Sequence, residues 1–247
     1  MTPPQRFVKT VLITGGARRI GAQISRYLHH AGLNIALHYR GSAAAAEALA
    51  VELNAQRPDS VAIFRADLCA LNELHALAAA VVQHFGGVDV LINNASTFYP
   101  TRLGEISSAH WEDLLGTNLK APLFLAQALA PVLAQRHGCI VNIVDIHALK
   151  PLKDYAVYSI AKAGLWTLTK ALARELGPQV RVNGVAPGAI LWPEADENTA
   201  SHAEMIQQTL LKREGSPQDI ARTVSFLIHD ADYITGQIIP VDGGRSV

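Results

Sequence analysis

Residues 10–21 read TVLITGGARRIG, and this stretch decides the fold. Thr10–Thr14 is an apolar run typical of a buried strand, and a helical pattern over Ile20–Ala31 follows the glycines directly. Glycines between a strand and a helix let the backbone turn tightly and approach a diphosphate, whose charge is stabilised at the helix N-terminus. The alternative is a tight strand-to-helix turn that binds nothing. The position of the turn, between the first strand and the first helix, favours nucleotide binding.

Apolar, β-rich runs alternate with amphipathic helical patterns along the rest of the chain, which predicts strand–helix units around a parallel sheet. Further strands are predicted at Asn34–Tyr39, Ser60–Arg65, Val88–Asn93, Cys139–Val144, Val180–Ala186 and Gln237–Val241. Further helices are predicted at Ala43–Gln56, Leu71–Phe85, Ala109–Gln135, Asp154–Leu176 and Pro217–Ile228. Runs such as VDVLINN and CIVNIV are almost continuously apolar, as strands covered on both faces are. The expected fold class is therefore α/β: a Rossmann-like, doubly wound, parallel seven-stranded sheet in a single domain, residues 1–247.

Composition narrows the classes of partner. Lysine plus arginine and aspartate plus glutamate both total 21, so the formal net charge is zero, whereas a nucleic-acid-binding protein normally carries a basic surplus. Cys69 and Cys139 lie in apolar surroundings without a paired spacing, and we expect reduced thiols. No signal peptide or membrane-spanning run is recognisable, so a soluble, cytoplasmic protein without a membrane partner is expected. The ten histidines have no metal-ligand spacing, and no metal is predicted.

The end of the second predicted strand indicates which cofactor is bound. Sites that prefer NAD place Asp or Glu about 20 residues after the glycines, where it holds the ribose 2′-OH. The corresponding stretch here, LHYRGS, contains no carboxylate. Arg40 can instead pair with a 2′-phosphate, Ser42 can donate to it, and Arg18 supplies a second cation. A single surface arginine is usually only solvated, but the combination predicts NADPH.

Polar and small residues also follow the third and fourth predicted strands. Asp67 is placed to accept a hydrogen bond from the adenine amino group, and Ala95, after Asn94, leaves room for a ribose. The alternative for each is a turn residue that satisfies the local backbone.

Tyr158 and Lys162 are four residues apart in a predicted helix and therefore share one face of it. A phenol with an unperturbed pKa of about 10 is a sluggish proton donor or acceptor near neutrality. An adjacent ammonium favours the phenolate, so Lys162 is expected to lower the pKa of Tyr158 toward a useful range. A pair of this spacing is usually ordinary helix surface, but its place after the fifth strand of a nucleotide-binding sheet favours catalysis.

Several motifs, taken together and in order, resemble the short-chain dehydrogenase/reductase family over about residues 8–244. They are TGGARRIG, NNA, Asn118, the Tyr158/Lys162 pair, Pro187-Gly188 and the terminal VDGG. The resemblance implies a Rossmann fold, hydride transfer from a nicotinamide and usually a homotetramer. It further implies that Tyr158 donates the proton, that Lys162 binds the nicotinamide ribose and tunes Tyr158, and that Asn118 holds a relay water. The cofactor contacts expected on this basis are Gly15, Arg18, Arg19, Ile20, Gly21, Tyr39, Arg40, Ser42, Asp67, Asn94, Ala95, Ser96, Lys162, Pro187 and Gly188.

Two departures from the common family pattern carry chemical information. Arg19 stands where the family has a third glycine, and Asp145 stands thirteen residues before Tyr158, where the family has a catalytic serine. Ketone reduction builds negative charge on oxygen, which a hydroxyl stabilises and a carboxylate repels. A pterin ring presents N–H and amino donors and a nitrogen that must be protonated, so an acceptor or proton carrier suits it. A protonated Asp145 would still be able to donate.

Asp145, Arg19, the run 94–100 (NASTFYP) and HYRGS together resemble the pteridine reductase branch of this family. By that resemblance Phe98 stacks on the pterin opposite the nicotinamide, Ser96 binds the pterin or a cofactor phosphate, and Arg19 reaches the diphosphate and the substrate edge. The alternative for Phe98 is an aromatic residue of the core. His147 is expected to be a packing or supporting residue rather than an acid or base. Residues 188–214 are predicted to form the substrate-binding loop region, with Trp192 and Leu210 among its lining.

The preferred functional hypothesis is NADPH-dependent reduction of pterins or dihydropterins, and potentially dihydrofolate, to tetrahydro forms, with a small-molecule pterin as partner. One alternative is a reductase of a ketone, a sugar or a 3-oxoacyl carbonyl, against which Asp145 argues. A more distant alternative is a module that binds NADPH without turnover, although Tyr158 and Lys162 are both present. By the family resemblance, the helices near Ala109–Gln135 and Asp154–Leu176 are expected to pair with their copies in a homotetramer.

Overall fold

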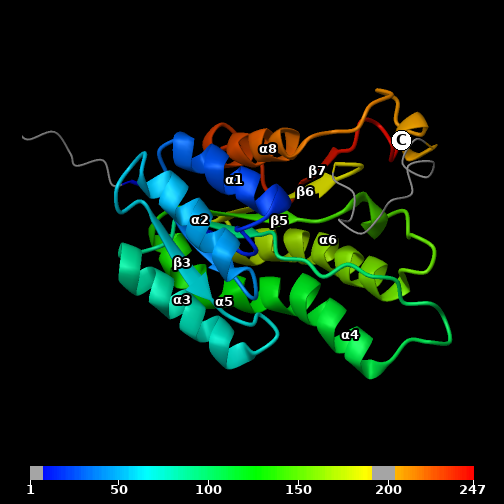
Figure 1. Cartoon of the computed structure of the whole chain (residues 1–247), viewed down its shortest axis with the longest axis horizontal. Coiled ribbons are helices and arrows are strands. Elements are labelled where there is room, and N and C mark those ends of the chain that lie inside the picture. The colour runs from blue at the N-terminus through cyan, green and yellow to red at the C-terminus, as the bar shows by residue number, and fades with distance from the viewer. Residues whose placement is uncertain (1–7, 191–203) are drawn as a thin grey trace, which may run out of the picture.

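The structure, a computed structural model of the chain, describes residues 8–190 and 204–247. Figure 1 shows its central sheet with helices packed around it. The sheet has seven parallel strands in the order β3-β2-β1-β4-β5-β6-β7. The strands are β1 Thr10–Ile13, β2 Asn34–Tyr39, β3 Val61–Arg65, β4 Val90–Asn93, β5 Cys139–Ile143, β6 Arg181–Pro187 and β7 Ile238–Val241. The predicted doubly wound α/β fold is confirmed, with strand ends shifted by one or two residues.

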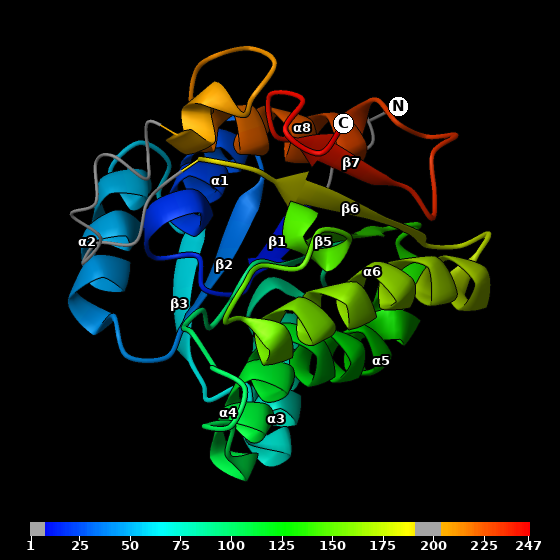
Figure 2. The ribbon, with the colours of Figure 1, turned by 90° about the vertical axis from the view of Figure 1, so that its right-hand side faces the viewer.

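Helices cover both faces of the sheet (Figure 2). One layer contains α1 (Arg19–His30), α2 (Ala43–Asn54) and α8 (Pro217–His229), and the other contains α3 (Leu71–Phe85), α5 (Ala121–Gln135) and α6 (Ala156–Leu176). Strand β1 shows why its sequence is continuously apolar. Val11 and Ile13 pack into the first layer and Leu12 into the second, and all three are fully buried. Both faces of the strand are therefore core.

The predicted helix Ala109–Gln135 is not one regular helix. It consists of α4 (Ser108–Leu115), a π-helical turn η1 (Gly116–Lys120) and α5. A Cβ at Gly116 would lie 2.8 Å from the Cys69 Sγ, so a larger residue at the start of this turn would require the Cys69 side chain to shift. The apolar periodicity did not reveal the π turn because one wider turn barely changes the pattern, although such turns are frequent at functional sites.

The strand order reverses between β1 and β4, since β2 and β3 lie on one side of β1 and β4–β7 on the other. In open α/β sheets ligands bind outside the carboxyl ends of the strands at this point. The segments that follow β1, β2 and β4 therefore meet at one crevice. Cys69 and Cys139 are free thiols, and only Cys139 is fully buried. None of the described helices is long and apolar enough to cross a membrane.

Candidate active site

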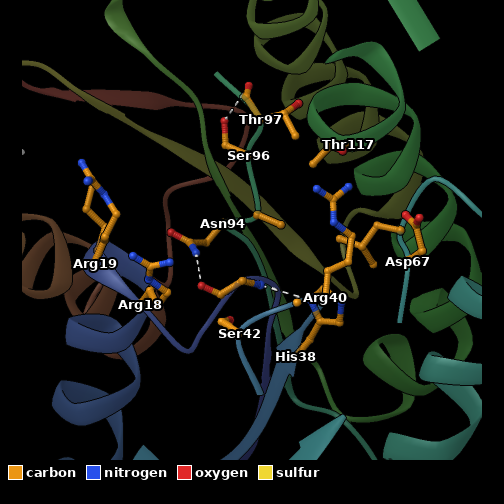
Figure 3. A pocket seen from close by; sticks show the side chains of 16 residues that line it. Arg18, Arg19, His38, Arg40, Ser42, Asp67, Asn94, Ser96, Thr97 and Thr117 are labelled. Carbon is orange, nitrogen blue, oxygen red and sulfur yellow. Dashed lines mark hydrogen bonds between the residues drawn. The ribbon is translucent and has the colours of Figure 1, made fainter. Parts of the chain in front are cut away.

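A cavity of about 560 Å³ lies where the fold predicts a ligand site, over the carboxyl ends of β1, β2 and β4 (Figure 3). Its volume is in the range typical of small-molecule sites. The residues that line it are Gly15, Arg18, Arg19, Ile20, Gly21, His38, Arg40, Gly41, Ser42, Asp67, Leu68, Asn94, Ala95, Ser96, Thr97 and Thr117. Most of the cofactor contacts expected from the sequence are thus brought together here.

The turn after β1 requires its glycines. Gly15 has a φ of +60°, and a Cβ at Gly21 would lie 2.2 Å from the Gly15 carbonyl oxygen. Arg19, at the start of α1, has a φ of +52°. This left-handed conformation costs a residue with a side chain roughly 1–2 kcal/mol, which explains why the family pattern has a third glycine here. Arg19 lines the cavity and therefore adds a cation to it.

Two side chains from neighbouring strands hold the Gly15 peptide. The Gly15 N–H donates to the His38 Nδ1 at 3.1 Å, and the Asn94 Nδ2 donates to the Gly15 carbonyl at 3.0 Å (Figure 3). His38 was not singled out in the sequence; Tyr39 was, but its side chain packs against the core on the other side of the strand. Alternation along β2 directs residues 38 and 39 to opposite faces. A histidine inside an otherwise apolar strand was the available signal.

The groups expected to bind a 2′-phosphate all line the cavity. Arg18 and Ser42 lie beside the turn, whereas the Arg40 side chain reaches toward Asp67 and Thr117 (Figure 3). Its Nη1 lies 3.9 Å from the Asp113 Oδ1. This pair is long and largely exposed, so it holds Arg40 only weakly.

Asp67 shows the local-turn role, and its contact with an adenine stays a prediction. It lines the cavity, and its Oδ1 accepts a hydrogen bond from the Cys69 N–H at 2.9 Å, as in a local turn. The segment after β3 is therefore shaped by the same side chain that faces the ligand space.

Asn118, in the π turn, is almost completely buried and is held by protein partners. Its Oδ1 accepts from the Ser96 Oγ at 2.6 Å, and its Nδ2 donates to the Leu114 carbonyl at 2.9 Å and the Thr97 carbonyl at 3.0 Å. The amide therefore ties the segment after β4 to α4. Thr97 and Thr117 also line the cavity, but neither was predicted from the sequence, where threonines in polar segments carry no distinctive pattern.

The expected catalytic group comes together at the carboxyl end of β5. The Tyr158 hydroxyl donates to the Asp145 Oδ2 at 2.7 Å, and the Asp145 Oδ1 accepts from the His147 N–H at 2.8 Å. The Lys162 Nζ donates to the Ile143 carbonyl at 2.9 Å and lies 5.7 Å from the centre of the Tyr158 ring. The His147 ring bonds to the Lys150 carbonyl at 2.9 Å, in keeping with a supporting role.

The electrostatics of this group differ from the expectation. Burial raises the pKa of Tyr158 well above its usual value, the Asp145 carboxylate raises it further, and a hydrogen bond from Ser96 opposes the rise. The predicted net fall of the Tyr158 pKa is therefore wrong, because burial and Asp145 outweigh any effect of the Lys162 charge. Burial also lowers the pKa of Lys162 to about 8, with Asp145 opposing. Tyr158 is consequently held as a phenol, and can donate its proton.

Phe98 lies beside this group and is 42% exposed, so it is not a residue of the core. Its ring stacks on Tyr155 with centroids 4.6 Å apart, and it meets the Tyr158 ring edge-on at 4.8 Å. Tyr155, which the sequence did not single out, extends the aromatic surface. Tyr99 turns elsewhere and donates its hydroxyl to the Asp113 Oδ2 at 3.0 Å.

Some predicted contacts lie apart from the cavity lining. Pro187 ends β6 and Gly188 follows it, with the Gly188 N–H bonded to the Val241 carbonyl at 3.0 Å. Leu210 lines a second cavity, of about 640 Å³, between α8 and β7. Trp192 lies outside the described residues, as do residues 191–203 of the expected substrate loop region.

The residues present fit a dinucleotide. The turn has no space for a Cβ at Gly21, three arginines line the cavity, and the first residues of α1, where a helix favours negative charge, line it too. A diphosphate and a further phosphate would find complementary charge in this cavity. Within residues 8–190 and 204–247, no three His, Cys, Asp or Glu side chains come together as metal ligands would.

Comparisons with known proteins agree with this geometry. The family model described as enoyl-(acyl carrier protein) reductase matches residues 15–246. The chain is 38% identical to "Pteridine reductase 1" of Leishmania tarentolae, with 96% of each chain covered. It is 40% identical to the 3-oxoacyl-(acyl-carrier-protein) reductase FabG of Staphylococcus aureus, with 97% of this chain and 98% of the relative covered. With the fold, the glycine-rich turn and the Tyr158/Lys162 pair, these matches show that the chain is an NAD(P)-dependent reductase and belongs to the short-chain dehydrogenase/reductase family.

Proposed function

We propose that this enzyme uses NADPH to reduce the ring of a pterin or dihydropterin toward the tetrahydro form. The observation that carries the proposal is the hydrogen bond from the Tyr158 hydroxyl to the Asp145 Oδ2, at 2.7 Å. The side chain beside the proton donor is thus an acceptor with negative charge, where the family pattern has a hydroxyl donor. The choice between ring nitrogen and ketone oxygen as the proton's destination rests on this difference.

The carboxylate suits a nitrogen heterocycle better than a ketone. A ketone oxygen gains negative charge as it is reduced, and Asp145 would repel it. A pterin offers N–H and amino groups that donate to a carboxylate, while its reacting nitrogen takes up a proton. The flat, exposed ring of Phe98 next to Tyr158 offers a stacking surface for such a ring.

NADPH bound in this cavity would supply the hydride that reduces a carbon of the substrate ring. Tyr158 gives the proton from its hydroxyl to the neighbouring ring nitrogen, which becomes strongly basic as the hydride arrives. Asp145 orients the hydroxyl and, together with burial, keeps it protonated until then. Lys162, through its bond to the Ile143 carbonyl, places its charge beneath the Tyr158 ring and stabilises the phenolate that remains.

The preference for NADPH is supported by the composition of the cavity. Arg18, Arg40 and Ser42 line it near the expected 2′-phosphate, and residues 37–42 contain no carboxylate that would bind a 2′-OH. Cations beside a 2′-phosphate favour the phosphorylated cofactor by charge-assisted hydrogen bonds.

A second candidate function is reduction of a 3-oxoacyl group attached to an acyl carrier protein. It is favoured by the 40% identity with the Staphylococcus aureus enzyme, which is similar to the identity with the Leishmania tarentolae enzyme. Asp145 argues against it, because the carbonyl oxygen would face a carboxylate instead of a hydroxyl.

Loss of NADPH absorbance measured with a matched panel of substrates separates the two candidates. The panel contains a pterin, a dihydropterin, dihydrofolate and a β-ketoester, each at the same concentration. We expect turnover with dihydropterin and little with the β-ketoester. Turnover of the β-ketoester alone would favour the second candidate, and absence of turnover with every compound would point to a module that binds NADPH without catalysis.

A further inference from the structure

The strand order places the turn after β1 between the carboxyl ends of β2 and β4. The Gly15 peptide is held from both sides, with its N–H bonded to His38 of β2 and its carbonyl bonded to Asn94 after β4 (Figure 3). The Gly16 N–H donates to the His38 main-chain carbonyl at 3.0 Å. His38 thus accepts hydrogen bonds from the first two N–H groups of the turn, from Gly15 through its side chain and from Gly16 through its backbone carbonyl.

These contacts define the protonation state of His38. The Gly15 N–H can only donate, so the His38 Nδ1 must carry a lone pair. The His38 Nε2 lies 3.1 Å from the Ala66 carbonyl, which can only accept, so this nitrogen carries the proton. The imidazole is therefore neutral, and both of its nitrogens are used. Its exposure is only 2%, so water has little access to replace either partner.

Protonation would break this arrangement. A proton on the Nδ1 would point at the Gly15 N–H, and two donors would face each other inside a buried contact. The turn has little freedom to retreat, because Gly15 lies against Ala95, where a Cβ would already be 3.0 Å away, and Gly21 lies against the Gly15 carbonyl. The N–H groups of Gly15 and Gly16 are both bonded to residue 38 and are not available to a ligand. A diphosphate would therefore be bound through the shape of the turn and the groups that follow Gly16.

We infer that His38 is a positioning residue of the cofactor site, and that nucleotide binding requires its neutral form as the acceptor for Gly15. The inference rests on the part of the proposed function in which this cavity takes the dinucleotide. It does not depend on which substrate is reduced.

The charges around His38 favour the neutral form at pH 7. Burial lowers the pKa of His38 and is the largest influence, while the hydrogen bond to Ala66 and the charge of Asp67 oppose it, and Arg40 adds to the lowering. Arg18 and Arg19, from the turn, line the same cavity and contribute positive charge on that side. The neutral acceptor is thus present at pH 7 and is lost as the pH falls through a value below about 6.5.

Two variants test the positioning role. His38→Leu removes the acceptor at similar size, and His38→Asn keeps an oxygen near the Nδ1 position without a titratable group. In fluorescence titrations, His38→Leu is expected to bind NADPH and NADH more weakly by the same factor, on the order of tenfold. The reason is that the buried Gly15 N–H loses its acceptor. His38→Asn is expected to stay within about threefold of the parent enzyme. Parent-like binding in the Leu variant, or a loss confined to NADPH, overturns the inference.

The pH profile of NADH binding is a test that needs only the parent enzyme and the Asn variant. NADH is the probe because the 2′-phosphate of NADPH itself titrates near pH 6, as phosphate monoesters do. The parent enzyme should bind NADH more weakly as the pH falls from about 8 to about 5, and His38→Asn should show a flat profile. Equal slopes in the two proteins overturn the inference. Failure to reduce pterins would contradict the proposed function, but the binding of NADPH and NADH by the His38 variants could still be measured and interpreted.

Discussion

Both carboxylate oxygens of Asp145 accept hydrogen bonds, one from the Tyr158 hydroxyl and one from the His147 N–H. It therefore acts on the proton donor directly and also shapes the 3-10 turn of residues 146–148. The carboxylate is part of the geometry of the site as well as of its charge, which makes it the residue where a substitution is most informative.

Asp145→Ser should reduce turnover of a dihydropterin by at least ~100-fold, the usual loss when an acid–base group is removed. The physical reason is that a neutral serine hydroxyl accepts hydrogen bonds from Tyr158 and from the donors of a pterin less strongly than a charged carboxylate does. Initial rates of NADPH consumption measure the effect, with Asp145→Asn as the control that keeps an acceptor without charge. Near-normal turnover in the serine variant would remove Asp145 from the mechanism.

Lys162 makes the reaction sensitive to alkaline pH. Burial lowers its pKa to about 8, so its charge is present below that pH and lost above it. The value of kcat/KM for a dihydropterin should therefore fall as the pH rises through about 8. Lys162→Arg keeps its charge to much higher pH, and should move the descending limb upward. A parent profile that stays flat to about pH 10 would show that the lysine charge is not needed.

Arg40 is expected to discriminate between the two nicotinamide cofactors. Arg40→Gln should weaken NADPH binding by roughly tenfold to a hundredfold, the worth of a hydrogen bond to a charged group, and leave NADH binding unchanged. Arg65→Gln is the control, because that arginine is exposed at the end of β3 and does not line the cavity. Equal losses of NADPH and NADH affinity would assign Arg40 to the diphosphate or the adenine instead.

At the scale of elements, the candidate site is built on a turn and a π-helical segment rather than on regular structure. In the turn between β1 and α1, the Gly21 backbone packs directly against the Gly15 carbonyl. In η1, Asn118 accepts a hydrogen bond from the Ser96 hydroxyl. The regular helices and strands supply the layers that keep these two segments in position.

Gly21→Ala should abolish measurable NADPH binding, because the added methyl would lie 2.2 Å from the Gly15 carbonyl and the turn would have to open. Gly41→Ala is a matched control in the same cavity, since a Cβ at Gly41 meets nothing within 4 Å. Isothermal titration compares the two variants, and thermal unfolding checks that both are folded. Undiminished binding in Gly21→Ala would mean that the turn is softer than its geometry indicates.

At the scale of the whole molecule, α4, α5 and α6 lie on one side of the sheet (Figure 2), and each exposes a large apolar side chain. These are Trp111, Leu123 and Ile160, with 43%, 38% and 49% of their surface exposed. If these helices pair between subunits, as the family resemblance predicts, these three side chains are the apolar groups that the contact would cover.

Light scattering of the parent enzyme should give about four times the chain mass of 26.5 kDa. Replacing Leu123 and Ile160 together by glutamate should produce smaller particles, because two charges would be buried in each contact. Tyr233→Glu, at a fully exposed residue before β7, should leave the mass unchanged. A parent enzyme that runs as a monomer would contradict the expected tetramer.

The sequence by itself determined the fold class, the order of the elements and the principal polar groups of the cavity. It did so because strand and helix periods are local, and because glycines, caps and a Tyr/Lys pair act within a few residues. The start of α8 is an example: Ser216 followed by Pro217 is a local pattern typical of a helix start, and in the structure the Ser216 hydroxyl accepts from the Asp219 N–H. The helix ends lie within one or two residues of the predicted ones, which is the usual uncertainty of helix boundaries.

Tertiary structure alone decided which groups meet. His38 holds Gly15, 23 residues away, and Asn118 holds Ser96, 22 residues away, because the sheet brings their strands and helices to one edge. The pKa of Tyr158 rises where the sequence predicted a fall, because its spacing to Lys162 is local but its burial and its contact with Asp145 are not. Desolvation is a property of the packed interior, and no pattern of neighbouring residues contains it.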